Sequence, residues 1–319
     1  MGTVYSIAAY APQSISLKNA VKQAFAEIDR LDALMSHYRP PSEICAINRG
    51  AAAGPMPVSA ELFAIIEEAF RISAETCGAF DVTVGPLMKA WGFFRRTGRI
   101  PIGDELAETR ARTGYQRVSL DPQAKTISFE CQGMELDLGA IGKGYAVDRA
   151  ATVLREHGVH NALISSGSSS IAALGAPPGE RGWPIALCDP RNRRKTSCLL
   201  RLSNLSISIS GNYEQMFVMN GRAYTHLLDP RSGQPVQGVL MTAVIGPSNV
   251  LTDALSTALF VLGVEDSRRF LQNRPEFVGL LFGSAGRDVE QTVLNMPNCA
   301  FPEGSFLQFE EGCSAWITR

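Results

Sequence analysis

The sequence predicts an α+β fold, and three features of the chain lead to that prediction. Up to about residue 160, segments with strand-like alternation are interspersed with segments of helical apolar spacing. From residue 160 onward short strand candidates dominate, and a further helical segment follows them near residue 251. No repeat, low-complexity tract or Pro/Gly-rich linker divides the 319 residues, so we expect one α+β unit, 1–319, with lobes at about 1–158 and 159–319.

The N-terminal third reads as one strand and two helices. TVYSIAAY alternates like a strand, and residues 14–35 follow with apolar side chains at helical spacing. Residues 36–50 form a polar segment, and residues 60–76 then predict a second amphipathic helix with Gly78 as its C-cap.

The middle of the chain predicts a hairpin and a strand that runs into a helix. Residues 95–113 are polar and irregular, and QRVSL and KTISFE then flank an Asp-Pro turn at 121–122. In the next segment, MELDL predicts a strand, a glycine-rich turn follows it, and a helix extends to His157. The later strand candidates are NALISS, IAALG, PIALCD, CLLRLSN, MFVMN, AYTHLLD and MTAVIG, and the late helix is expected over 251–262.

Composition excludes some classes of partner. With 30 Lys+Arg against 31 Asp+Glu, the net charge of −1 predicts no nucleic-acid partner, so an anionic ligand must be held locally. No apolar run is long enough for a membrane helix, and MGTVYSIAAY lacks the basic and apolar regions of a signal peptide. The seven cysteines include no CxxC pair, and we expect ordinary reduced thiols.

The turn from Asp137 to Asp148 contains three glycines and Lys143 between the predicted strand and helix. Glycines let a ligand approach the backbone, and a helix N-terminus together with a lysine favours an anion. The spacing matches neither a Walker A loop nor a dinucleotide fingerprint. The residues alone leave open whether this turn binds phosphate or is a tight connection.

Asp253 and Thr257 stand four residues apart in the late helix, hence on one face of it. Carboxylate and hydroxyl oxygens are ligands that Mg²⁺ prefers, with waters and substrate phosphates completing its shell. Both residues could equally be structural, Asp253 as a helix N-terminal acid.

Three further segments contain residues suited to chemistry or to binding. His226 is placed on a strand that runs into an Asp-Pro turn, and an imidazole can transfer protons near neutral pH. Its position alone also fits a structural histidine. Phe80 fits ring binding and core packing equally, Trp91 favours the core, and Ser208–Tyr213 reads as a small-residue turn that lines a pocket or joins two strands.

Taken in order, seven segments resemble the ApbE family of FAD:protein FMN transferases. They are MGTVYSI, MSHYRPPSEICAIN, GAFDVTVGPLMKAWGF, DLGAIGKGYAVD, SGNYEQMF, YTHLLDPRSGQPV and TDALSTALF. The resemblance spans almost the whole chain, and it implies a T-fold-like α+β unit whose two lobes enclose a flavin cleft.

The resemblance also implies a set of site residues. Mg²⁺ at the diphosphate of the substrate FAD would be held by the backbone carbonyl of Ala140 and the side chains of Asp253 and Thr257. His226 stands at the position of the family's candidate general base. The flavin contacts would fall on Met1, Tyr38, Ala79, Phe80, Asp81, Asp137 and Lys143.

The implied reaction moves FMN from FAD to a Thr or Ser hydroxyl of an acceptor protein and releases AMP. Family acceptors are flavin-carrying subunits of membrane redox complexes, modified within a short motif that contains Ser or Thr. Hydrolysis of FAD to FMN and AMP, and flavin binding without chemistry, remain alternatives.

This chain departs from the family pattern at two places. Many members have Gly-Gly-Asp where this chain has Gly167 followed by Ser168 to Ser170. Family members are usually periplasmic or lipid-anchored and have a signal segment before MGT, whereas MGT starts this sequence.

Overall fold

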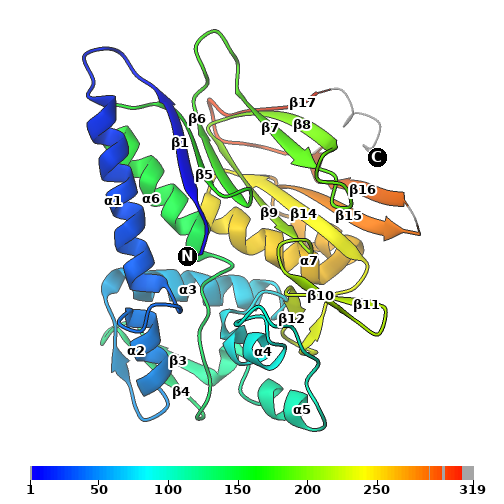
Figure 1. The fold of residues 1–319 in the computed structure, drawn as a ribbon. Helices are drawn as coiled ribbons and strands as arrows, with labels where there is room; N and C mark the ends of the chain where they lie inside the picture. The colour runs from blue at the N-terminus through cyan, green and yellow to red at the C-terminus, as the bar shows by residue number, and fades with distance from the viewer. Residues whose placement is uncertain (1, 287, 297–298, 311–319) are drawn as a thin grey trace. The chain divides into compact units, whose positions relative to one another are not determined.

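A computed structural model describes residues 2–286, 288–296 and 299–310, and Figure 1 shows their helices and strands. The chain falls into two compact units. Apart from Met1, the first unit comprises Leu31–Ala140 and Asn212–Gln237, and the second comprises Gly2–Arg30, Ile141–Gly211 and Gly238–Arg319. Each unit draws on both of the ranges 1–158 and 159–319, and the division into functional lobes stays a prediction.

The second unit is built on a seven-stranded antiparallel sheet. Its strands, in spatial order, are β1 (Tyr5–Tyr10), β5 (Asn161–Ser166), β6 (Ser170–Leu174), β9 (Leu205–Gly211), β14 (Val239–Gly246), β15 (Val278–Ala285) and β16 (Asp288–Leu294). Side chains of β5 alternate between buried and partly exposed, as expected for a strand that covers a core with one face. In the β1–β5 register, Ile7 pairs with Ile164.

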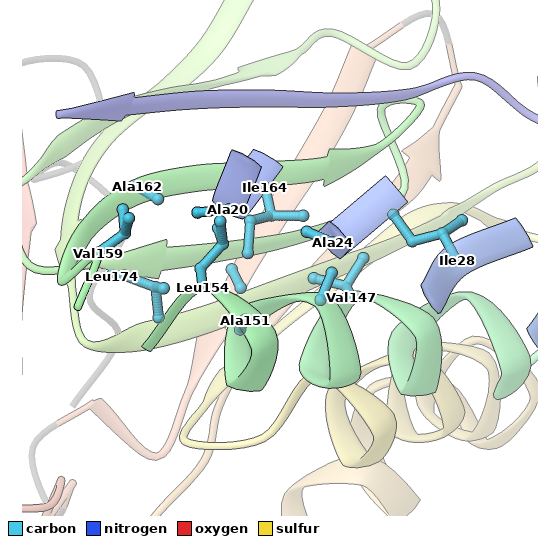
Figure 2. Packing of buried hydrophobic residues seen from close by; sticks show 12 residues of the cluster. Ala20, Ala24, Ile28, Val147, Ala151, Leu154, Val159, Ala162, Ile164 and Leu174 are labelled. Atoms are coloured by element: carbon cyan, nitrogen blue, oxygen red, sulfur yellow. The ribbon is translucent and has the colours of Figure 1, made fainter. Parts of the chain in front are cut away.

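Helices cover this sheet and close its core. Helix α6 (Gly142–Glu156) packs on β5 and β6, and α7 (Asn249–Leu271) packs on β9, β14 and β15. In Figure 2, Ala20 and Ala24 of helix α1 (Leu17–Met35) lie near Val147 and Leu154 of α6. Small alanines on α1 suit such close packing, and this cluster holds α6 at the sheet.

The second unit also contains a three-stranded sheet in the order β17 (Phe306–Phe309), β8 (Thr196–Ser203) and β7 (Trp183–Cys188). Cys198 of β8 is disulfide-bonded, so the expectation of reduced thiols fails there. Among the described cysteines, the free thiols are Cys45, Cys77, Cys131, Cys188 and Cys299.

The first unit combines short helices with three small sheets. The helices are α2 (Glu43–Gly50), α3 (Ala60–Glu75), η1 (Val82–Val84), α4 (Gly85–Ala90), α5 (Glu105–Arg110) and η2 (Tyr115–Arg117). The strands are β2 (Met56–Pro57), β4 (Thr126–Phe129) and β3 (Val118–Asp121) in one sheet, β10 (Met216–Met219) with β11 (Arg222–Thr225), and β12 (Leu228–Asp229) with β13 (Gln234–Pro235). Trp91 is buried as predicted, and its Nε1 donates to the carbonyl of Gly233 at 2.8 Å.

The structure confirms the α+β class and most of the predicted elements. Strand β1, helices α3 and α6, and the β3–β4 hairpin lie where the sequence placed them. Helix α1 begins at Leu17, three residues later than expected, and α7 exceeds 251–262 at both ends with a non-helical Gly263 (φ 72°) inside it. Among the described residues, no helix has the length and apolar content for a membrane span.

Two segments described as polar from the sequence contain helices. The polar segment 36–50 includes α2, which begins where the Ser42 hydroxyl accepts a hydrogen bond from the N–H of Cys45. Segment 95–113 includes α5. Both helices have eight residues or fewer, too short for a clear helical period in the sequence.

The predicted strand MELDL is wrong. The N–H and C=O of Leu136 both bond to the side-chain amide of Asn48, at 2.8 and 2.9 Å, and the N–H of Asp137 donates to Val82. A distant side chain therefore satisfies backbone groups that a strand partner would otherwise take. Ser208 to Gly211, read as a turn, instead form the end of strand β9.

Candidate functional site

The predicted site residues form two groups, one in each unit. Lys143, Asp253 and Thr257 belong to the second unit, whereas Tyr38, Ala79 to Asp81, Asp137, Ala140 and His226 belong to the first. Met1 lies outside the described residues.

Asp253 is the centre of the second group. Its side chain is 4% exposed, and one carboxylate oxygen, Oδ2, accepts the backbone N–H of Gly144 at 2.9 Å. The other oxygen, Oδ1, accepts the Ser170 hydroxyl at 3.1 Å and lies 3.4 Å from Nζ of Lys143. A buried carboxylate is stable only with such donors, and here the first turn of α6 supplies two of them.

Gly144 brings α6 close to α7. A Cβ at this position would lie 2.2 Å from the carbonyl oxygen of Asn249 and 2.8 Å from Cβ of Asp253. Only glycine allows this approach, which places Lys143 beside Asp253. One glycine of the turn therefore serves helix packing, and Lys143 remains the turn's candidate for binding an anion.

Hydroxyl side chains line the contact between β9 and α7. Ser210 contacts Thr257 and Ser256, with oxygen–oxygen distances of 3.2 and 2.8 Å. Ser208 contacts Thr252 at 2.9 Å and donates to the side-chain oxygen of Asn249 at 3.0 Å. Sheets and helices ordinarily meet through apolar side chains, so this layer of oxygens is a feature of the site.

Tyr5 of β1 belongs to the same buried region. Burial raises the pKa of Tyr5 to about 12, a hydrogen bond with Ser166 opposes this rise, and the negative charge of Asp253 adds to it. The phenol is therefore neutral at physiological pH and contributes no charge beside the carboxylate.

The donor set fits a hard cation. Asp253 and Thr257 both lie on α7, four residues apart, as the sequence predicted. Among the described residues, no group of three or more His, Cys, Asp or Glu side chains is arranged to hold a metal ion. A single carboxylate with hydroxyl oxygens suits Mg²⁺, which fills its remaining positions with waters and phosphate oxygens. Ala140, in the first unit, stays a predicted ligand.

In the first unit, Asp137 is paired with His37. Nδ1 of His37 lies 3.0 Å from Oδ1 of Asp137, and the same oxygen accepts the N–H of Gly139 at 2.8 Å. The His37 ring contacts Tyr38 with 3.9 Å between centroids, and Phe94 stacks on Tyr38 at 5.2 Å. His37 therefore contacts two predicted flavin contacts, Tyr38 and Asp137.

A cavity of about 160 Å³ adjoins this pair. Its lining includes both charge signs, the cations Arg49 and Lys89 and the carboxylates Glu135 and Asp137, and Lys89 is paired with Glu135. Nε2 of His37 is buried and has no hydrogen-bond partner among the described residues. Burial of an unpaired ring nitrogen is costly, so the atom is placed to bind a ligand atom or a water.

The segment Ala79 to Asp81 is buried. Ala79 and Phe80 are each 1% exposed, so the Phe80 side chain packs in the core, and a flavin contact there would involve backbone atoms. Asp81 accepts hydrogen bonds from the backbone N–H groups of Thr83 and Tyr115, both at 2.8 Å. Burial raises the pKa of Asp81, and these hydrogen bonds oppose the rise. Its carboxylate therefore holds η1 and the start of η2.

His226 does not lie on a strand, which corrects the prediction. It follows β11, and both its backbone N–H and its Nδ1 lie 3.1 Å from the carbonyl oxygen of Gln215. Since a carbonyl only accepts, Nδ1 carries the proton, and Nε2 of the neutral ring then has the lone pair. This is the tautomer that a general base requires at Nε2.

Sequence reasoning missed two residues, His37 and Gln215. His37 lay in a segment read as a polar loop, and its contact with Asp137 joins positions 100 residues apart in the sequence. Gln215 acts through its backbone carbonyl, which no side-chain pattern reveals. Ser170, one of the serines that replace residues of the family's Gly-Gly-Asp, donates a hydrogen bond directly to Asp253.

Comparisons with known proteins show the family to which the chain belongs. Residues 1–282 match the model of the ApbE family. The chain is 32% identical over 273 residues to the FAD:protein FMN transferase of Haemophilus influenzae, covering 82% of this chain and 79% of the relative. It is 32% identical to that of Vibrio cholerae, with 83% and 80% covered.

Solved structures show the same fold. The flavinyl transferase ApbE of Pseudomonas stutzeri superposes with a TM-score of 0.82 at 30% identity, covering 92% of each chain. The flavin transferase ApbE of Vibrio cholerae gives 0.83 at 28% identity, covering 93% of this chain and 96% of its own.

Proposed function

Because the chain belongs to the ApbE family, we propose that it is a Mg²⁺-dependent FAD:protein FMN transferase that modifies a Thr or Ser hydroxyl. The observation that carries this proposal is the buried carboxylate of Asp253. The first turn of α6 donates a hydrogen bond to this carboxylate, and Asp253 lies on helix α7 together with Thr257. An oxygen-rich, mostly buried site beside Lys143 suits a diphosphate with its cation. The full-length likeness to named FMN transferases makes FAD the expected diphosphate.

The proposed reaction exchanges one P–O bond for another. The acceptor hydroxyl oxygen attacks the phosphorus on the FMN side of the FAD diphosphate. The bond from that phosphorus to the bridging oxygen breaks, AMP leaves with the bridging oxygen, and the acceptor keeps FMN as a phosphoester. The hydroxyl proton passes to the base.

His226 is the proposed base. Its Nδ1–H is held by the Gln215 carbonyl, so Nε2 can accept the hydroxyl proton as the new bond forms. The same hydrogen bond stabilises the ring when it becomes positively charged. Phe93 lies edge-on to the imidazole, at 6.4 Å between centroids.

Asp253, Thr257 and the Ala140 carbonyl would hold Mg²⁺, which when bound neutralises diphosphate charge and makes AMP a better leaving group. Lys143 adds a second positive charge near the phosphates. On the flavin side, Tyr38 and Asp137 are the proposed contacts that the geometry favours most, because Tyr38 is 53% exposed and Asp137 lines the cavity. The acceptor we propose is a flavin-carrying subunit of a membrane redox complex.

The His226→Ala variant tests this assignment. We expect FMN transfer to fall by about 10²- to 10⁴-fold, the range for loss of a general base, with FAD affinity little changed. His160→Ala removes an exposed histidine and serves as the matched control. Full transfer activity in His226→Ala would contradict the assignment. Release of FMN and AMP without acceptor labelling by the wild type would instead identify a pyrophosphatase.

A further inference from the structure

The β10–β11 hairpin lies directly before His226 in the chain. Its strands pair in antiparallel register, with Phe217 opposite Tyr224 and Val218 opposite Ala223. Asn220 and Gly221 between them have φ angles of 52° and 72°, the positive values of a tight hairpin turn. The hairpin is therefore a well-defined local structure.

One face of the hairpin packs against other residues of the first unit. Phe217 and Tyr224 stack with 5.1 Å between centroids, Tyr224 contacts Trp91 at 5.6 Å, and Phe217 contacts Phe93 at 5.6 Å. This aromatic cluster fixes the position of both strands, and with them the start of the His226 segment.

The opposite face of the hairpin exposes apolar side chains. Met216 is 48% exposed and Val218 is 64% exposed, and Ala223, the partner of Val218, is exposed beside it. If this face of β10 contacted only solvent, polar side chains would be expected at its alternate positions. This chain has Met216 and Val218 there instead. In the described sheets β10 pairs only with β11, so its second edge belongs to no sheet.

The hairpin also positions the proposed base. Gln215, the residue before β10, receives both hydrogen bonds from His226. Its side-chain Oε1 is buried and has no hydrogen-bond partner among the described residues. Because His226 is held at the Gln215 carbonyl, an acceptor hydroxyl that reaches His226 comes close to the start of β10.

We propose that the outer face and second edge of the β10–β11 hairpin dock the acceptor protein, which adds an extended segment as a strand along β10. This inference rests on the proposed function, because the segment is the one that contains the modified Ser or Thr. Apolar side chains at alternate positions of the segment contact Met216 and Val218, and backbone groups of the segment pair with the second edge of β10. Strand addition sets the register, which places the hydroxyl at His226.

Binding of a non-reactive acceptor tests the proposal separately from the chemistry. The probe is a purified flavin-carrying domain of a membrane redox-complex subunit, with its motif Ser or Thr replaced by Ala so that no FMN can be transferred. The double variant Met216→Gln, Val218→Thr keeps side-chain size and changes only exposed positions, so the fold should be retained. The control Ile102→Thr alters an equally apolar side chain that is 81% exposed in the same unit.

We expect the double variant to bind this domain at least about tenfold more weakly than the wild type, and Ile102→Thr to bind it as the wild type does. Equal affinity of the double variant and the wild type would overturn the proposal, as would a wild type that does not bind the domain. Failure of the proposed function has a different signature, namely binding of the unmodified acceptor domain without any FMN adduct.

Discussion

The backbone N–H of Gly144 on α6 donates a hydrogen bond of 2.9 Å to the carboxylate of Asp253 on α7. The contact exists because glycine lets the two helices approach, and it fixes the carboxylate beside Lys143. The close packing of α6 on α7 and the position of the candidate metal ligand Asp253 therefore depend on each other. Substitutions at either residue separate their contributions.

Gly144→Ala should destabilise the protein. The added methyl group meets the carbonyl oxygen of Asn249 at 2.2 Å, so α6 and α7 must move apart. Overpacking of this kind costs about 1–3 kcal/mol, more than the roughly 1 kcal/mol that alanine gains in a helix. Thermal unfolding measures the change. Gly283→Ala is the matched control, because its nearest contact would be at 3.9 Å. Equal melting temperatures would refute the close packing.

Asp253→Asn should remove the Mg²⁺ dependence of FAD binding. The amide keeps the size of the side chain and an acceptor for Gly144, but it loses the charge that attracts a cation. We expect FAD affinity without Mg²⁺ to stay similar, and the gain that Mg²⁺ gives the wild type to disappear. Fluorescence titration of FAD with and without Mg²⁺ checks this. Asp266→Asn alters an exposed acid on the same helix and should behave like the wild type.

His37→Leu should weaken FAD binding with little effect on kcat. The substitution removes the hydrogen bond to Asp137 and alters the ring contact with Tyr38, so both proposed flavin contacts lose their support. We expect about a tenfold rise in the KM for FAD, and partial rescue by His37→Asn, whose amide can donate where Nδ1 does. His160→Leu is the control. An unchanged KM would show that His37 does not position the flavin contacts.

Tyr5 should make stability fall at high pH. Tyrosine in the unfolded chain loses its proton near pH 10.0, whereas the pKa of Tyr5 in the folded protein is about 12. As the pH rises, the unfolded state is therefore deprotonated, and stabilised, before the folded state is. Tyr5 therefore makes its full contribution to the free energy of unfolding below pH 10. As the pH rises to 12, about 1–3 kcal/mol of that free energy is lost. Chemical denaturation of the wild type and Tyr5→Phe between pH 8 and pH 12 isolates this contribution. Parallel curves for the two proteins would contradict it.

Local patterns predicted the local parts of the site. The spacing of Asp253 and Thr257 placed both on one helix, and the Asp-Pro turn located the β3–β4 hairpin. Contacts between distant residues were not predictable in this way. The Asn48 amide replaces a strand partner for Leu136, and Asp137 is held by a histidine 100 positions earlier. Such pairs depend on tertiary packing, which periodicity does not encode.

The segment at Phe80 is a second case in which the sequence did not decide the environment of a side chain. Its sequence fitted ring binding and core packing equally, and only the structure shows the side chain to be 1% exposed. The tautomer of His226 likewise follows from a backbone carbonyl, that of Gln215, and not from any neighbouring side-chain type. Family resemblance located these positions, and the geometry now limits what each can do.

The most direct test of FMN transfer to protein is the intact mass of the acceptor domain after incubation with the wild-type protein, FAD and Mg²⁺. We expect one added FMN on the motif Ser or Thr, an equal amount of AMP released, and no adduct when Mg²⁺ is chelated. Release of FMN and AMP with the acceptor mass unchanged would contradict FMN transfer to protein.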